Sequence, residues 1–129
     1  MIRFLTGIFI VLHGLVHLWY VTLSQRLVEF QADMGWTGES WAFTNLLGDG
    51  PSRSLASLLY LLAALGFVAG GFGLFIQQDW WRPVLAGSAI FSSAVILLFW
   101  DGSTQMLVQK GLLWLLINLG VLATILLLK

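Results

Sequence analysis

Two histidines near the N-terminus are the residues of this sequence whose side chains and spacing could form a functional site. His13 and His17 lie four positions apart, so on a helix they would project from the same face. Thr6, Tyr20 and Ser24 continue this face, because at about 100° per residue all five project within roughly 40° of one line. Inside a membrane such a stripe predicts either a ligand or proton path or hydrogen bonds that join helices.

Haem and metal ions fit this pair less well than a hydrogen-bonded ligand does. Two histidines on one helix face cannot bind one iron from opposite sides, and no third histidine exists, so only a haem shared between subunits would remain. A zinc or copper site needs a third or fourth ligand. The sequence offers no cysteine, and only Asp101 could approach from a loop end. A quinone or lipid headgroup could instead use the hydrogen bonds of His13, His17 and Tyr20.

Asn118 adds a fourth polar residue near the middle of the last apolar segment. An amide at bilayer depth must find a hydrogen-bond partner, since an unpaired polar group there costs several kcal/mol. The available partners are the histidines and the serines at 88, 92 and 93. We therefore expect the histidines and Tyr20 to face the protein interior. The predicted ligand or proton path consists of His13, His17, Tyr20 and Asn118.

The composition indicates that membrane helices position these residues. Of the 129 residues, 59% are hydrophobic and 9% are charged, against roughly 25% charged in soluble domains, which excludes a soluble monomer. Residues 4–23, 55–76, 84–100 and 111–128 form four apolar segments without Asp, Glu, Lys or Arg, each near the length of about 20 residues that spans a bilayer. They lack the alternation of barrel strands. The sequence thus predicts an all-α, integral membrane four-transmembrane-helix bundle, with residues 1–129 as one domain.

Residues 24–54 form the only sizeable predicted extramembrane loop, and they contain four of the six acidic side chains. Residues 48–51 read as a turn, after which Ser52 or Ser54 could cap the second helix. Residues 40–47 could form a short interfacial helix that presents Trp41 and Phe43 to the headgroups.

Three glycines of the second segment predict close helix packing. Gly66, Gly70 and Gly73 lie along one edge, and residues 66 and 70 form a small-x-x-x-small pair. Small residues let helix backbones approach closely in a membrane. The partner helix could lie in the same bundle or in a second protomer.

The orientation is weakly determined by the sequence. Lysines and arginines near the segment ends set the orientation, and here they divide three to three between the two sides. The acidic first loop inclines the prediction toward both termini being cytoplasmic, with dual topology as the alternative. The expected location is the plasma (inner) membrane. The apolar run after Arg3 is too long for a cleaved signal and is interpreted as a retained helix. With the N-terminus inside, the cytoplasmic side carries Arg3, Arg82 and Lys129, and the other side carries Arg26, Arg53 and Lys110.

Residues 6–18, which include His13-Gly14-Leu15-Val16-His17, resemble the first helix of DoxX-like membrane proteins. There an apolar run leads to a His-Gly-x-x-Lys-like sequence, and His17 stands at the lysine position. Residues 70–74, followed by Arg82, are similar to the second helix and basic turn of that family. The resemblance implies a compact four-helix bundle, sometimes associated with quinone-linked redox complexes. Small multidrug resistance transporters are similar in size and helix count, but their acidic residue in helix one is missing here.

The remaining features favour a nonenzymatic membrane protein. With a net charge of zero, the chain has no excess of basic residues that would attract nucleic acid. It also has no nucleotide-binding motif and no nucleophile elbow. We therefore predict no catalytic residues and a small subunit or quinone- or lipid-binding component of a larger membrane assembly or homo-oligomer. The alternative is a small proton-coupled or polar-substrate transporter that uses the stripe of His13 and His17.

Overall fold

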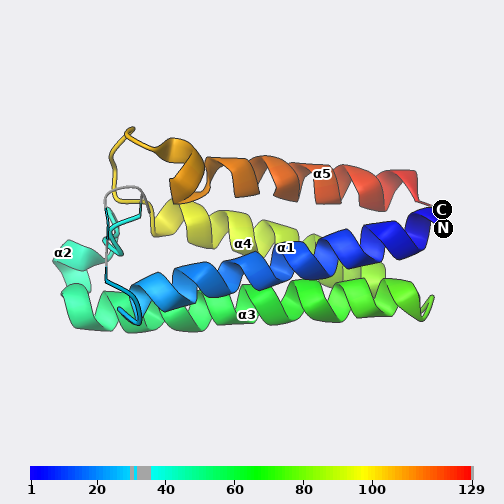
Figure 1. The fold of residues 1–129 in the computed structure, drawn as a ribbon, viewed down its shortest axis with the longest axis horizontal. Coiled ribbons are helices and arrows are strands. Elements are labelled where there is room, and N and C mark those ends of the chain that lie inside the picture. The colour runs from blue at the N-terminus through cyan, green and yellow to red at the C-terminus, as the bar shows by residue number, and fades with distance from the viewer. Residues whose placement is uncertain (30, 32–35, 129) are drawn as a thin grey trace.

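The computed structural model describes residues 1–29, 31 and 36–128, and its four long helices lie side by side (Figure 1). The start of α1 and the end of α5 lie at one end of the bundle, whereas residues 36–48 and the 99–107 connection lie at the other. In chain order the elements are α1 (Ile2–Ser24), the short α2 (Thr44–Leu47), α3 (Asp49–Phe75), α4 (Trp81–Leu98), the π-helical turn η2 (Val108–Leu112) and α5 (Leu113–Leu127).

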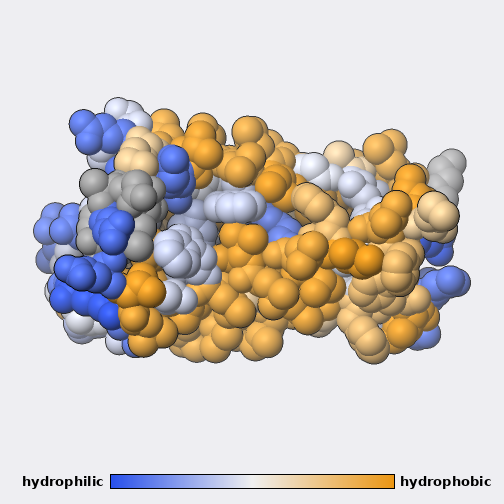
Figure 2. All heavy atoms as spheres, in the orientation of Figure 1, coloured by the Kyte–Doolittle hydropathy of each residue, from blue (hydrophilic) through white to orange (hydrophobic). Residues whose placement is uncertain are grey.

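Among the described residues, four helical segments are long and apolar enough to cross a membrane: Ile2–Ser24, Asp49–Phe75, Trp81–Leu98 and Val108–Leu127. The shortest, with 18 residues, is about 27 Å long at about 1.5 Å per residue, close to the hydrocarbon thickness of about 30 Å. Figure 2 shows an apolar surface across the middle of the molecule, with hydrophilic residues gathered mainly at its ends. The protein is an all-α bundle of membrane-spanning helices, which confirms the predicted fold class.

The second and third spans begin earlier than the sequence patterns predict. α3 begins at Asp49 rather than near residue 55, and no side-chain hydrogen bond caps it, so the predicted turn and serine cap are wrong. Pro51 and Pro83 lie in the first turns of α3 and α4, where the missing N–H of proline costs nothing. Lys129 of the charge count and residues 30 and 32–35 of the predicted loop lie outside the described residues.

The last span begins with a π-helical turn instead of directly at residue 111. Gly111 within this turn has φ of 126°, a left-handed conformation that glycine adopts without steric cost. The preceding Lys110 forms an ion pair with Asp101 at 2.9 Å, and both side chains are 6% exposed. This ion pair fastens the 99–107 connection to the start of the last span.

α1 and α3 pack closely because glycines remove side chains at their contact. A Cβ atom on Gly14 would lie 2.7 Å from Cβ of Phe67, and one on Gly71 would lie 2.7 Å from Cγ2 of Val11. Real Cβ atoms essentially never approach this closely. The two helices therefore run along each other with little separation, which places the histidine face of α1 inside the bundle.

α3 and α4 pack through the glycine edge noted in the sequence. A side chain on Gly66 or Gly70 would clash with Ser88 or Leu85 of α4. A Cβ atom on Gly73 would lie 2.7 Å from the ring of Trp80. All three glycines therefore pack against residues of their own chain, which is the first of the two predicted kinds of contact.

The connection after α1 caps the end of α4. Nε1 of Trp36 donates to the carbonyl of Phe99 at 2.7 Å, and Nε1 of Trp41 donates to the carbonyl of Leu97, also at 2.7 Å. Ser40 donates its hydroxyl to the carbonyl of residue 98. The last carbonyls of a helix lack intrahelical donors, so these bonds satisfy α4 and hold the connection on the bundle.

The predicted interfacial helix is shorter than expected. Only Thr44–Leu47 is α-helical, because Thr44 Oγ1 accepts from the backbone N–H of Ser40 and that segment forms a turn. Trp41 is exposed, but Phe43 packs on Phe99 with ring centroids 5.3 Å apart. The expectation that Phe43 faces the headgroups is therefore wrong.

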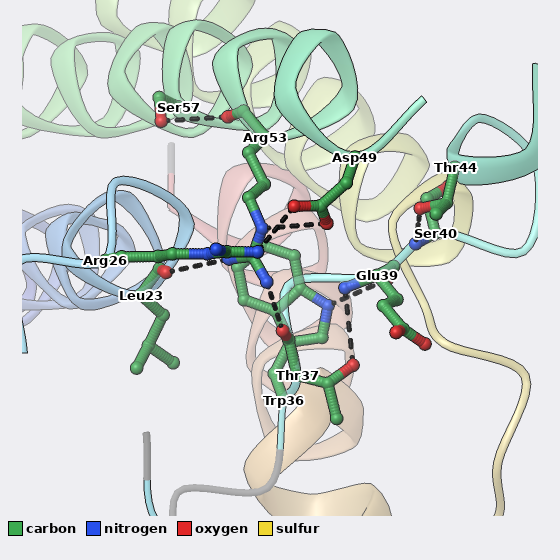
Figure 3. A network of polar contacts seen from close by, with 10 residues as sticks. All are labelled: Leu23, Arg26, Trp36, Thr37, Glu39, Ser40, Thr44, Asp49, Arg53 and Ser57. Carbon is green, nitrogen blue, oxygen red and sulfur yellow. Dashed lines mark hydrogen bonds and ion pairs between the residues drawn. The ribbon is translucent and has the colours of Figure 1, made fainter. Parts of the chain in front are cut away.

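Arg53 joins three segments at this end of the molecule (Figure 3). Its guanidinium donates to the carbonyls of Leu23 and Thr37 at 3.3 and 2.8 Å and to the carboxylate of Asp49 at 3.0 Å. Arg26 pairs with the same carboxylate. This network connects the end of α1, the following connection and the start of α3.

Candidate functional site

The polar side chains of three helices meet inside the bundle. α1 contributes His13 and His17, α4 contributes Ser92 and Ser93, and α5 contributes Asn118. The two histidines, Ser92 and the amide are at most 3% exposed. Because these groups are far from the helix ends, each must find a partner within the bundle.

Ser93 determines the orientation of the Asn118 amide. The Ser93 hydroxyl donates to the carbonyl of Ala89 at 2.7 Å, so its oxygen can only accept from the amide, which lies 3.1 Å away. The Asn118 nitrogen therefore faces Ser93 and Ser92, to which it also donates at 3.1 Å. Its oxygen consequently faces His13.

The proton positions of the two histidines follow from these contacts. Nε2 of His13 lies 2.8 Å from Oδ1 of Asn118, an atom that only accepts, so Nε2 must donate. Nδ1 of His17 donates to the carbonyl of His13 at 3.0 Å. In neutral His17 the other nitrogen, Nε2, accepts from the Ser92 hydroxyl at 2.6 Å. The two neutral imidazoles are thus opposite tautomers.

This assignment leaves Nδ1 of His13 as an acceptor without a donor. Among the described residues, it is one of two buried side-chain polar atoms that lack a hydrogen-bond partner, the other being the Ser52 hydroxyl. His13 itself is 3% exposed. A buried unpaired acceptor is costly, so this atom is the chemically notable feature of the cluster.

Aromatic rings enclose His13. Phe67 contacts it edge-on with centroids 4.8 Å apart, and the ring of Trp114 lies at 5.8 Å. The ring of Phe9 is nearly parallel to the imidazole, with centroids 6.4 Å apart. Phe9 is 52% exposed, so it separates the imidazole from the outer surface of the bundle.

Tyr20 is buried with the histidine face but belongs to another cluster. Its ring stacks on Tyr60 with centroids 4.8 Å apart and contacts Trp36 at 5.7 Å. Its hydroxyl donates to the carbonyl of Gln109 at 3.1 Å, which links α1 to the residues before α5. The structure therefore brings His13 and Asn118 of the predicted path together but does not join Tyr20 to them.

A groove lies between α1 and α5 beside the histidine cluster. α1 packs along α3, α3 along α4 and α4 along α5, whereas contact between α1 and α5 is sparse. The groove has a volume of about 280 Å³, and Figure 2 shows paler and bluer atoms along this seam within the apolar surface. Its lining residues are Thr6, Phe9, Ile10, Ile117, Gly120, Val121 and Thr124.

The groove and the histidine cluster adjoin each other. Phe9 lines the groove and also stacks over His13. On the opposite side, Ile117 and Val121 line the groove on either side of Asn118 in the sequence. A molecule in the groove would therefore lie one aromatic ring away from the imidazole of His13.

The donor set around the histidines is that of a hydrogen-bonding site. In the part of the chain that the structure describes, no group of three or more His, Cys, Asp or Glu side chains is placed to hold a metal ion. The hydrogen bonds from His13 through Asn118 and Ser92 return to the His13 carbonyl through His17. Among the described residues, no hydrogen bond extends this ring to either end of the bundle.

The sequence analysis did not predict two buried residues that lie outside the histidine cluster. Trp36 is fully buried against Tyr20 and Tyr60, and Lys110 is buried with Asp101. Trp36 lies in a polar segment whose pattern carries no signal for burial. No family model, curated protein or solved structure matches this chain.

Proposed function

We propose that the protein is a nonenzymatic membrane bundle that binds a membrane-dissolved ligand, of lipid or quinone type, in the groove between α1 and α5. The observation that carries this proposal is the position of the groove, which is open toward lipid and lies one aromatic ring away from the buried imidazole of His13, whose Nδ1 has no partner among the described residues. The apolar lining fits an acyl chain or an isoprenoid segment.

The volume of the groove sets the size of this ligand. Pockets for small molecules range from about 300 to 1,000 Å³, and the groove of about 280 Å³ lies just below that range. It therefore accommodates a ring or a chain segment, while the rest of the ligand extends into the bilayer.

The hydrogen bonds of the cluster leave none of its described donors free for general acid catalysis. The hydroxyls of Ser92 and Ser93 and the N–H groups of both histidines are donated to other protein atoms. General acid catalysis needs a proton that is within reach of the substrate. The unpaired group of the cluster is an acceptor, which is suited to holding a ligand.

Gly120 provides the direct test of the groove. It lines the groove, and a Cβ atom added there meets no atom within 4 Å, so we expect Gly120→Leu to extend into the groove without straining the backbone. Native mass spectrometry of the protein released from lipid nanodiscs should show a retained lipid or quinone on the wild type and its loss from Gly120→Leu.

Gly87→Leu is the matched control. Gly87 lines a separate lipid-facing groove of about 360 Å³ on α4, and a side chain there also meets no atom within 4 Å. This variant should retain the ligand. Equal retention by both variants, or no retained ligand on the wild type, would contradict the proposal.

We further propose that the bundle works as a small subunit of a membrane assembly or a homo-oligomer in the plasma (inner) membrane. A stable complex after purification in mild detergent supports this role. Proton-dependent uptake by the protein alone in liposomes would instead support the transporter alternative. The DoxX-like resemblance stays a prediction.

A further inference from the structure

We propose that the head of the groove ligand is a hydroxyl group that donates a hydrogen bond to Nδ1 of His13. This inference rests on the proposed function of the groove and specifies its ligand class. The ligand would be an apolar body that carries a hydroxyl, such as a lipid alcohol or the reduced, quinol form of a quinone, rather than a head that only accepts.

The proton count of the cluster leads to this class. Ser93 gives its proton to the Ala89 carbonyl and so turns the Asn118 nitrogen toward the serines. The amide oxygen then takes the Nε2 proton of His13. In neutral His13 the remaining nitrogen holds a lone pair, and a ketone, ether or ester oxygen has no proton to offer it.

The surroundings of His13 leave this lone pair to a ligand. Trp114 is close enough for a ring contact but does not donate to Nδ1 of the imidazole, and Phe67 has no donor. His17 donates to the His13 carbonyl rather than to its ring. Within the described residues, Nδ1 therefore has no protein donor.

Phe9 lines the groove and stacks on the imidazole that carries this nitrogen. Its ring lies parallel to the imidazole and is half exposed toward lipid. In this proposal, rotation of the Phe9 side chain lets a hydroxyl in the groove reach Nδ1. We therefore expect Phe9→Ala, which removes the intervening ring, to strengthen binding of the hydroxyl ligand.

Two probes of equal chain separate the hydroxyl contact from simple filling of the groove. Dodecanol carries the donor, and dodecyl methyl ether does not. Titrations of the protein in nanodiscs, followed by tryptophan fluorescence and by the ¹⁵N signal of His13, should show about fivefold tighter binding of dodecanol, the factor that a neutral hydrogen bond of about 1 kcal/mol gives. Only dodecanol should shift the Nδ1 resonance upfield.

A second pair of probes distinguishes the source of the hydroxyl. Decylubiquinol and decylubiquinone share one body, and only the quinol donates. If the quinol exceeds dodecanol in affinity, the physiological ligand class is the quinol; if dodecanol is the tighter ligand, it is a lipid alcohol. Both results retain the hydroxyl contact.

Each remaining outcome decides one of the two proposals. Equal binding of dodecanol and its ether, abolished in both cases by Gly120→Leu, would overturn the hydroxyl contact but keep the groove as a ligand site. Binding of neither probe would overturn both. If the protein prefers dodecanol but the Nδ1 resonance of His13 does not shift, the hydroxyl binds elsewhere and this inference is overturned. The same conclusion follows if the preference for dodecanol is unchanged in Gly120→Leu.

Discussion

At the residue scale, the histidine cluster is defined by which atoms hold protons. Ser93 donates to a backbone carbonyl and thereby orients Asn118, which in turn places the proton of His13 on Nε2. His17 has the opposite arrangement because its Nδ1 faces the His13 carbonyl. Two histidines one helical turn apart consequently have different roles: one closes the network, and the other keeps a free acceptor.

The tautomers can be measured directly. In ¹⁵N spectra of histidine-labelled protein at neutral pH, we expect His13 to be protonated on Nε2 and His17 on Nδ1, because Asn118 Oδ1 and the His13 carbonyl can only accept. A His17→Gln variant assigns the two sets of signals. Observation of the same tautomer at both positions would contradict the proton assignment.

Asn118 should contribute measurably to stability. Asn118→Leu keeps a similar volume but leaves the Nε2–H group of His13 buried without an acceptor. We expect Asn118→Leu to lower the free energy of unfolding in detergent by about 1 kcal/mol, since hydrogen bonds between membrane helices average about 0.6 kcal/mol with a maximum of about 1.7. The lipid-exposed neighbour Leu119→Val is the control, and an equal effect of both changes would refute the contribution.

At the element scale, the bundle has closely packed sides and one open side. Glycines bring α3 against both α1 and α4, as at Gly14 and Gly70. α1 and α5 instead have sparse contact, and the hydrogen bond described between them joins His13 to Asn118. Backbones that are held apart by hydrogen-bonding side chains leave a groove, whereas glycine contacts exclude one.

The two kinds of side should respond differently to one added methyl group. Gly70→Ala places a Cβ atom against Leu85, whereas Gly87→Ala on α4 meets nothing within 4 Å. We expect Gly70→Ala to lower the free energy of unfolding by about 1–3 kcal/mol, as overpacking does, and Gly87→Ala to change it little. Thermal unfolding in detergent measures both, and equal stabilities would show that the α3–α4 contact is looser than described.

At the scale of the whole molecule, polar contacts close both ends of an apolar bundle. Trp36 and Arg53 hold the connection over one end. At the other end, the Arg82 guanidinium donates to the carbonyl of Ile125 at 2.8 Å and to that of Leu128. Helix ends that would be unsatisfied are thus bonded where lipid gives way to headgroups, while the exposed leucines and isoleucines between them face hydrocarbon.

Labelling of introduced cysteines tests this arrangement, and the absence of native cysteine makes each signal unambiguous. A membrane-impermeant maleimide should react at the connections but not in the spans. The span positions point outward from the bundle, so their protection would come from lipid rather than from protein packing. Labelling at any span position would show that this helix does not cross the membrane. The span positions are Leu12, Leu62, Ile90 and Leu116, and the connection controls are Gln25 and Gln78.

The sequence alone was sufficient to predict that the protein lies in lipid and that it is a bundle of helices. Four apolar runs of spanning length must be helices in lipid, because only intrahelical bonds satisfy every backbone group of a single span. The same reasoning placed the histidine face inward and paired it with Asn118 or a serine, since lipid offers no partners. The polar positions of a membrane segment are therefore readable from one sequence.

Only the tertiary structure decided how these groups are connected. The choice of Asn118 and Ser92 as separate partners of His13 and His17 depends on the rotation of α4 and α5, which apolar periodicity does not specify. The burial of Trp36 and the ion pair of Lys110 also depend on how the connections fold back. The free acceptor on His13 results from the complete set of hydrogen bonds, and such a set exists only when α1, α4 and α5 are in place.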